Sequence, residues 1–256
     1  MAMAEGQREK VISGRLKDPI RKTCGASITE ELEKAYSKYW YVPFDIPIIK
    51  ANDHEYFVNW YFANSGIAVK QKTNLANPYN WSLTNNHFRT INSDAVNNEI
   101  WSKTYISETF VKFPELKEQV LEYFPITSLN LWRMWSSTAR ILNHRDDDAL
   151  VDFPCAMRVK LYDENPTETL WLREDDEPYN NFILPELKET NSFAWNNVRT
   201  YHGSNYDPEY KKILWLITVD SNLNTNKYID LMDRSINKYT DKVMIDHRPR
   251  EYYYDL

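Results

Sequence analysis

The pattern of apolar and polar positions divides the chain into a helical first half and a strand-rich second half. Apolar residues recur at helical spacing behind the capping-box pair Ser27 and Glu30, again over 93–110, and again from Pro114 to Pro125. Region 52–86 has no clean period and predicts short strands and loops. Short apolar runs predict strands over 128–134, 155–161, 170–172, 192–198 and 212–219.

Helices followed by many short strands predict an α+β fold whose strands form a sandwich or barrel. We expect a flexible arm over 1–26 and a single domain over 27–256. Within that domain the order predicts a helical and mixed layer over 27–125, a strand core over 126–221 and a helical tail over 222–256. No internal repeat or Pro-, Gly- or Ser-rich linker divides it.

Alternation in two predicted strands, 155–161 and 212–219, separates cations from apolar residues. Arg158 and Lys160 share one face of the first strand, and Lys212 lies opposite the bulky apolar residues of the second. We expect the apolar faces to lie under helices and the cations to face the interior. Buried cations need a partner, and a dicarboxylate ligand would serve. The alternatives are that they reach solvent or pair with protein carboxylates.

Composition excludes several classes of function. The 256 residues include 37 acidic and 31 basic side chains, a net charge of -6, so nucleic acid is a poor partner. Only 5 glycines are present and no phosphate-binding glycine motif occurs. No apolar run is long enough to span a bilayer and no secretory signal is recognisable, so we expect a cytoplasmic protein with no membrane partner.

The most informative motif is His144-Arg145-Asp146, with His202 far downstream and Lys212 ten positions later. Two imidazoles and a carboxylate can occupy one face of a metal octahedron and leave the other open for small molecules. His144 and Asp146 are two apart on a segment that we expect to be extended, so they point to one side. A hairpin would bring Lys212 near His202. The tripeptide alone is equally compatible with a solvated polar turn.

The residues from 142 to 161, with this motif followed by Arg158-Val159-Lys160-Leu161, resemble the aspartyl/asparaginyl β-hydroxylase group of 2-oxoglutarate/Fe(II) oxygenases. A second block with Trp195-Asn196-Asn197, His202, Asn205 and the strand from Lys212 to Asp220 is similar to the group's distal-histidine block. Together they cover roughly residues 126 to 221. Two departures are present: Lys212 stands where the group has Arg, and Lys160 replaces the histidine of its R-x-H motif.

The resemblance implies a double-stranded β-helix, the jelly-roll or cupin-like barrel. It implies that His144, Asp146 and His202 ligate Fe(II), that Lys212 binds the distal carboxylate of 2-oxoglutarate, and that Arg158 assists. With O2, such a site hydroxylates an unactivated C–H bond, here of an amino acid or a residue in a polypeptide, and releases succinate and CO2. Two other functions stay open: a non-catalytic jelly-roll binding or assembly module, and a divalent-metal hydrolase that uses the same ligands.

Overall fold

The computed structural model describes residues 30–64, 88–92, 106–129, 131–137, 141–144, 153–164, 170–173, 182–184, 187–197, 199–204, 211–218 and 223–248. The predicted flexible arm over 1–26 lies outside these ranges, as do Asp146 and Asn205.

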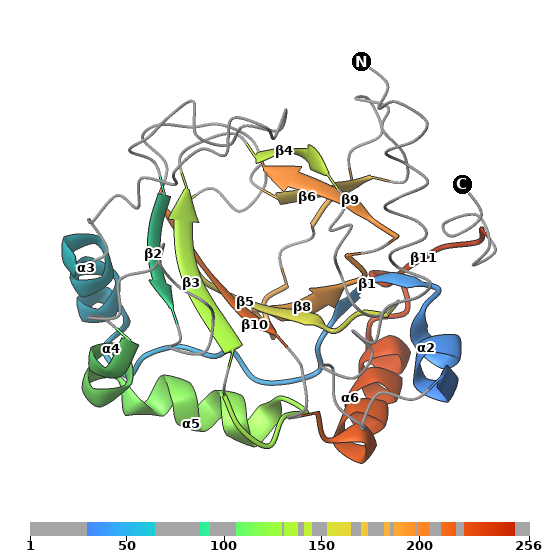
Figure 1. The fold of residues 1–256 in the computed structure, drawn as a ribbon, viewed down its shortest axis with the longest axis horizontal. Helices are drawn as coiled ribbons and strands as arrows, with labels where there is room; N and C mark the ends of the chain where they lie inside the picture. The colour runs from blue at the N-terminus through green and yellow to red at the C-terminus, as the bar shows by residue number, and fades with distance from the viewer. Residues whose placement is uncertain are drawn as a thin grey trace, which may run out of the picture.

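The described helices are α2 (Glu30–Tyr36), α3 (His54–Asn64), α4 (Ile106–Lys112), α5 (Pro114–Tyr123) and α6 (Thr225–Lys238). The strands form two antiparallel sheets (Figure 1). In the large sheet the spatial order is β11 (Met244–Ile245), β1 (Tyr39–Pro43), β8 (Ser192–Trp195), β5 (Ala156–Asp163), β10 (Lys212–Thr218), β3 (Leu131–Ser137) and β2 (Phe88–Asn92). In the small sheet it is β4 (Ile141–His144), β9 (Tyr201–Ser204), β6 (Leu170–Arg173) and β7 (Phe182–Ile183).

The chain passes back and forth between the two sheets from β3 to β10. Strands β3, β5, β8 and β10 belong to the large sheet, and β4, β6, β7 and β9 to the small one. Figure 1 shows the small sheet on one side of the curved large sheet and the helices on the other side. Among the described strands the two sheets stay open and do not close into a barrel.

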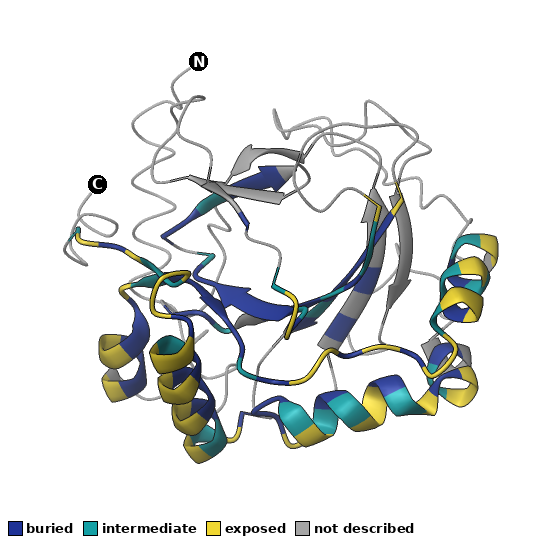
Figure 2. Cartoon of the chain, turned by 180° about the vertical axis from the view of Figure 1, so that it is seen from behind, coloured by how far each residue is buried: buried dark blue, intermediate teal, exposed yellow. Residues whose placement is uncertain are grey.

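The main core lies between the helices and the outer face of the large sheet. Met157 and Val159 of β5 and Trp215 of β10 are fully buried there, in one cluster with Val120 of α5 and Tyr228 of α6. The helices turn their exposed residues away from the sheet (Figure 2). The predicted facing of these two strands is therefore confirmed: their bulky apolar residues lie under helices.

A smaller apolar cluster lies on the inner face of the large sheet, the face toward the small sheet. It consists of Tyr41, Leu184, Phe193, Trp195 and Leu214. Two of its members are register partners of cations: Phe193 pairs with Arg158, and Leu214 pairs with Lys160. The inner face thus combines aromatic side chains with cations.

The predicted helix from Pro114 to Pro125 is confirmed as α5. The prediction of short strands and loops over 52–86 is wrong in its described part, where α3 occupies 54–64. Aromatic residues lie all around this helix, with Phe57 buried and Tyr56 exposed, so its sequence has no apolar stripe. The missed signal was Asp53, whose side chain accepts a hydrogen bond from the Tyr56 amide as a helix N-cap does.

Candidate functional site

Two of the three predicted metal ligands occupy directly paired positions in the small sheet. His144 is the last residue of β4, an edge strand, and its register partner on β9 is His202. Directly paired positions of an antiparallel ladder lie on the same face, with Cα atoms about 4.5–5.5 Å apart. The third predicted ligand, Asp146, lies outside the described residues.

The imidazole of His202 is buried, with 8% of the residue exposed. Its Nδ1 lies 3.2 Å from the carbonyl oxygen of Thr200. A carbonyl oxygen only accepts, so this contact assigns the proton to Nδ1 and the lone pair of the neutral ring to Nε2. A backbone carbonyl that fixes the ring through one nitrogen is the usual support for a histidine that binds a metal through the other. The donor chemistry of His202 therefore fits a metal ligand.

The short loop before β9 is held by buried polar contacts. Asn196 donates from its side-chain amide to the carbonyl of Ser37 at 3.0 Å, and Arg199 pairs with Asp246 at 3.4 Å. Asp246 also accepts from Arg248 at 3.1 Å. The Asp246 carboxylate is itself buried, so both ion pairs are shielded from solvent. These contacts fix the backbone from which His202 projects.

Trp195 lies next to both His202 and Arg158. The ring centroids of Trp195 and His202 are 5.1 Å apart, and the guanidinium carbon of Arg158 lies 3.3 Å from the Trp195 ring centroid. Arg158 is 4% exposed and donates to Oδ1 of Asn197 at 3.0 Å. The predicted inward facing of Arg158 is thus confirmed. Sequence reasoning did not select Trp195 or Asn197 as site residues, although alternation along β8 places Trp195 on the face of Phe193.

Lys212 is also on the inner face, and it is 3% exposed. Burial lowers its pKa from 10.5 to about 8, while the charge of Asp163 acts in the opposite direction. Asp163 is the register partner of Lys212 and also forms an ion pair with Lys160, Nζ to Oδ2 3.3 Å. We call Lys160, Asp163 and Lys212 the charged triad. A protein carboxylate near the buried lysine was one of the alternatives left open by the sequence.

Asp163 was missed because a β-bulge changes the alternation of β5. Strict alternation places Asp163 on the outer face with Leu161. In the structure Leu214 pairs with Lys160 and Ile213 pairs with Tyr162, which leaves Leu161 as the extra residue. A bulge of one residue exchanges the faces beyond it, so Asp163 joins the inner face.

The predicted hairpin between the strands of His202 and Lys212 is wrong. Strand β9 pairs with β4 and β6, whereas β10 pairs with β3 and β5 in the other sheet. The two residues belong to facing sheets. Among the described residues, no three His, Cys, Asp or Glu side chains lie together in a way that could hold a metal ion.

The remaining histidines do not join this site in the described part of the chain. His54 packs between Phe57 and Tyr162, with ring centroids 6.3 Å from each. His247 is exposed, and His87 lies outside the described residues. None of the helices in the described ranges is long and apolar enough to cross a membrane.

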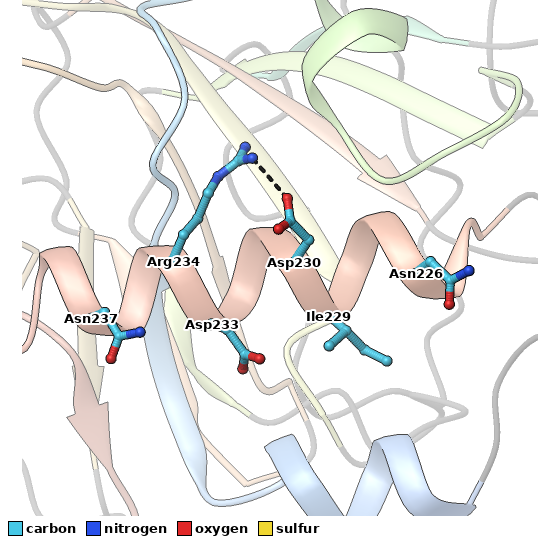
Figure 3. Close-up of a pocket in the computed structure, with 6 residues that line it drawn as sticks. All are labelled: Asn226, Ile229, Asp230, Asp233, Arg234 and Asn237. Atoms are coloured by element: carbon cyan, nitrogen blue, oxygen red, sulfur yellow. Dashed lines mark hydrogen bonds and ion pairs between the residues drawn. The ribbon is translucent and has the colours of Figure 1, made fainter.

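A pocket also opens on helix α6, in the helical layer over the outer face of the large sheet (Figure 3). Its lining residues follow one another along α6: Asn226, Ile229, Asp230, Asp233, Arg234 and Asn237. Arg234 forms an ion pair with Asp230 at 3.0 Å, and Asp233 accepts from the Tyr36 hydroxyl at 2.8 Å. These charged groups have partners within the helical layer. None of the residues that line this pocket lies on the inner face of the large sheet with Arg158 and Lys212.

No protein-family model and no curated protein matches the sequence. Solved structures show weak similarity. The crystal structure of EvdMO1 superposes with a TM-score of 0.39 at 14% identity over 72% of this chain, which spans only 48% of EvdMO1. TqaL, an Fe(II)/α-ketoglutarate-dependent dioxygenase, gives 0.36 at 10% identity, covering 83% of this chain and 88% of TqaL. A Trichoplax adhaerens prolyl hydroxylase, in complex with a peptide fragment of hypoxia inducible factor, gives 0.36 at 12%, covering 86% and 94%.

Proposed function

We propose that the protein is an Fe(II)- and 2-oxoglutarate-dependent dioxygenase that hydroxylates an unactivated C–H bond. The observation that carries this proposal is the direct pairing of His144 with His202 on adjacent strands. The two histidines are 58 positions apart in sequence, yet they are register partners in the small sheet. Each side chain is of a type suited to bind a metal. The predicted carboxylate, Asp146, follows His144 by two positions.

The strand order supports the proposal. Eight strands from β3 to β10 divide into four of the large sheet, in the order β8-β5-β10-β3, and four of the small sheet, in the order β4-β9-β6-β7. A jelly roll is likewise built from eight strands in two sheets. We infer that these strands are the double-stranded β-helix and that β1, β2 and β11 extend its large sheet.

Three side chains would hold the metal: His144, Asp146 and His202. Bound Fe(II) would supply the redox chemistry that activates O2, with 2-oxoglutarate converted to succinate and CO2. The contribution of the protein is placement. The Thr200 carbonyl fixes the His202 ring. The buried aromatic residues of the smaller cluster would limit the access of water to bound groups.

Two inner-face cations would hold the co-substrate. Lys212 is buried and suited to the distal carboxylate, and Arg158 is held against Trp195, which itself lies beside His202. An ammonium group provides a point charge without the fork geometry of a guanidinium, so Lys212 can bind a carboxylate without demanding one orientation. The substrate that we propose is an amino acid or a residue in a polypeptide.

The decisive experiment is an anaerobic titration of the full chain with Fe(II) and 2-oxoglutarate, followed by admission of O2. A visible charge-transfer band before O2 and succinate after it are expected. A protein that gives neither, yet folds normally, is not a dioxygenase and fits the binding-module alternative. Hydrolytic activity with Zn²⁺ or Mn²⁺ in the absence of O2 would instead identify a metal hydrolase.

The substrate class needs a separate experiment. Free amino acids and short peptides are screened for stimulation of succinate formation, with aspartyl, asparaginyl and prolyl peptides in the first set. A peptide that stimulates turnover and gains 16 mass units, as expected for insertion of one oxygen atom, supports the proposed class of substrate. Stimulation only by compounds that are neither amino acids nor peptides contradicts it.

A further inference from the structure

The charged triad contains two ammonium groups and one carboxylate on the inner face. Asp163 is the register partner of Lys212 and lies 3.3 Å from Nζ of Lys160. Its side chain is 6% exposed, compared with 20% for that of Lys160. The carboxylate therefore acts on both lysines from within the protein rather than from solvent.

An anionic ligand that binds to Lys212 meets this carboxylate as a like charge. Two buried carboxylates a few Å apart repel more strongly than in water because the interior screens charge poorly. The lysines attract the ligand, and Asp163 partly neutralises that attraction. A ligand with one carboxylate therefore gains little from binding to the charged triad alone.

We propose that Asp163 is a specificity-determining residue of the anion site at Lys212, and that it restricts this site to ligands that are also held at a second point. The proposal rests on the proposed function, in which the second point is the metal that His144 and His202 would ligate. Two-point binding makes the second contact intramolecular, which compensates for weak affinity at the first. The ligand class is a dicarboxylate long enough to reach from the charged triad to the metal.

The test compares two ligands with wild-type protein and Asp163→Asn, both loaded with Fe(II) under anaerobic conditions. The pH is about 6.5, below the pKa of about 8 of Lys212 in the wild-type protein. 2-Oxoglutarate has the distal carboxylate, whereas 2-oxobutyrate has the same chelating 2-oxo acid without it. Asp163→Asn is expected to bind 2-oxoglutarate about tenfold more tightly and to bind 2-oxobutyrate within about twofold of wild type.

Glu164→Gln is the matched control. Glu164 is the next residue, it is exposed, and its carboxylate accepts from the Lys211 amide at 2.9 Å. The variant removes the same charge one position away, so unchanged affinity for 2-oxoglutarate is expected. Lys160→Met makes the opposite change to the charged triad, and weaker binding of 2-oxoglutarate is expected. Thermal unfolding of each variant shows whether it is folded.

The pH profile provides a second measurement. Two charged groups of β5 lie on this side of Lys212: Asp163, its register partner, and Lys160, which forms an ion pair with Asp163. Asp163 favours the protonated lysine, so its replacement should move the loss of 2-oxoglutarate affinity to a lower pH. The variant would then bind more tightly than wild type at about pH 6.5 and lose this advantage as the pH rises.

Three outcomes would overturn the inference. Asp163→Asn could bind 2-oxoglutarate no better than wild type, it could gain equally for 2-oxobutyrate, or Glu164→Gln could give the same gain. In each case the proposed function stands if wild-type protein still forms the charge-transfer band. Wild-type protein that binds no 2-oxoglutarate would overturn both proposals.

Discussion

The two faces of the large sheet are built from alternate residues of the same strands, and they differ in what they bury. On the outer face Ile213, Trp215 and Ile217 of β10 pack with the helices in the larger apolar cluster. On the inner face Lys212 and Leu214 of the same strand lie with cations, a carboxylate and a small aromatic cluster. The outer face buries side chains that need no partner, whereas the inner face buries charges that do.

Successive residues of one strand therefore have different roles: those on the outer face stabilise the fold, and those on the inner face are suited to bind a ligand. Burial of apolar side chains stabilises the fold, and a buried unpaired cation costs free energy unless a ligand or a carboxylate compensates. Substitutions on the outer face should therefore mainly lower the free energy of unfolding. Substitutions on the inner face, and at the histidines opposite it, should change ligand binding and turnover first.

The largest expected effect is at the histidines. His144→Ala and His202→Ala should each reduce succinate formation by at least about a hundredfold, since even residues that only support a metal ligand cost 10–100-fold when replaced. His247→Ala is the control, because His247 is exposed and is not one of the proposed metal ligands. Turnover is measured with each variant at saturating Fe(II). Full activity in either of the first two variants would contradict the ligand assignment.

On the outer face the largest effect is expected for Trp215→Ala. Trp215 is fully buried, with its ring 5.6 Å from that of Phe110 and 6.1 Å from that of Trp132. Removing it should lower the free energy of unfolding by about 3–5 kcal/mol, measured by urea denaturation. Trp215→Phe keeps an aromatic ring and should lose less. A loss below about 1 kcal/mol for the alanine variant would show that the outer face is not the main core.

Lys212→Met on the inner face should have the opposite effect to Trp215→Ala: it should weaken ligand binding and leave stability unchanged. It replaces a buried cation by an apolar side chain of similar length. Asp163 keeps its ion pair with Lys160, and burial already disfavours the charged lysine, so the free energy of unfolding at neutral pH should not decrease. The affinity for 2-oxoglutarate should fall at least about tenfold, because the charge that binds the distal carboxylate is lost. The comparison of unfolding with ligand titration separates the two effects. A variant that loses stability but keeps its affinity would show that Lys212 is a structural residue.

Lys212 also predicts a dependence of stability on pH. Its pKa is lowered to about 8 in the folded protein from 10.5. Between these values the unfolded chain binds more protons than the folded one, so the free energy of unfolding should rise with pH from about 8 towards 10.5. Lys212→Met should remove this rise. Urea denaturation of both proteins at several pH values measures the difference, and an identical slope in the two proteins would contradict it.

The sequence predicted the elements whose pattern is local. The strands β5 and β10 and the facing of their residues were predictable from alternation, and α5 from Pro114 and its apolar stripe. It did not predict α3, which is aromatic on several sides, or the β-bulge that turns Asp163 inward. The pairing of His144 with His202 depends on how distant strands align, and a period of two cannot specify that alignment.

The smallest expected effect concerns the helical layer alone. Asn224 precedes α6, and its side-chain oxygen accepts from the Lys227 amide at 3.1 Å, as an N-cap does. Asn224→Ala should lower the free energy of unfolding by about 1 kcal/mol. Helix α6 covers the outer face, so the affinity for 2-oxoglutarate should stay unchanged. Asn224→Asp is the control: it keeps the hydrogen-bond acceptor and should change neither the free energy of unfolding nor the affinity. A change in ligand affinity with Asn224→Ala would show that the two faces are coupled through the sheet, and the separation of stability from function proposed for them would not hold.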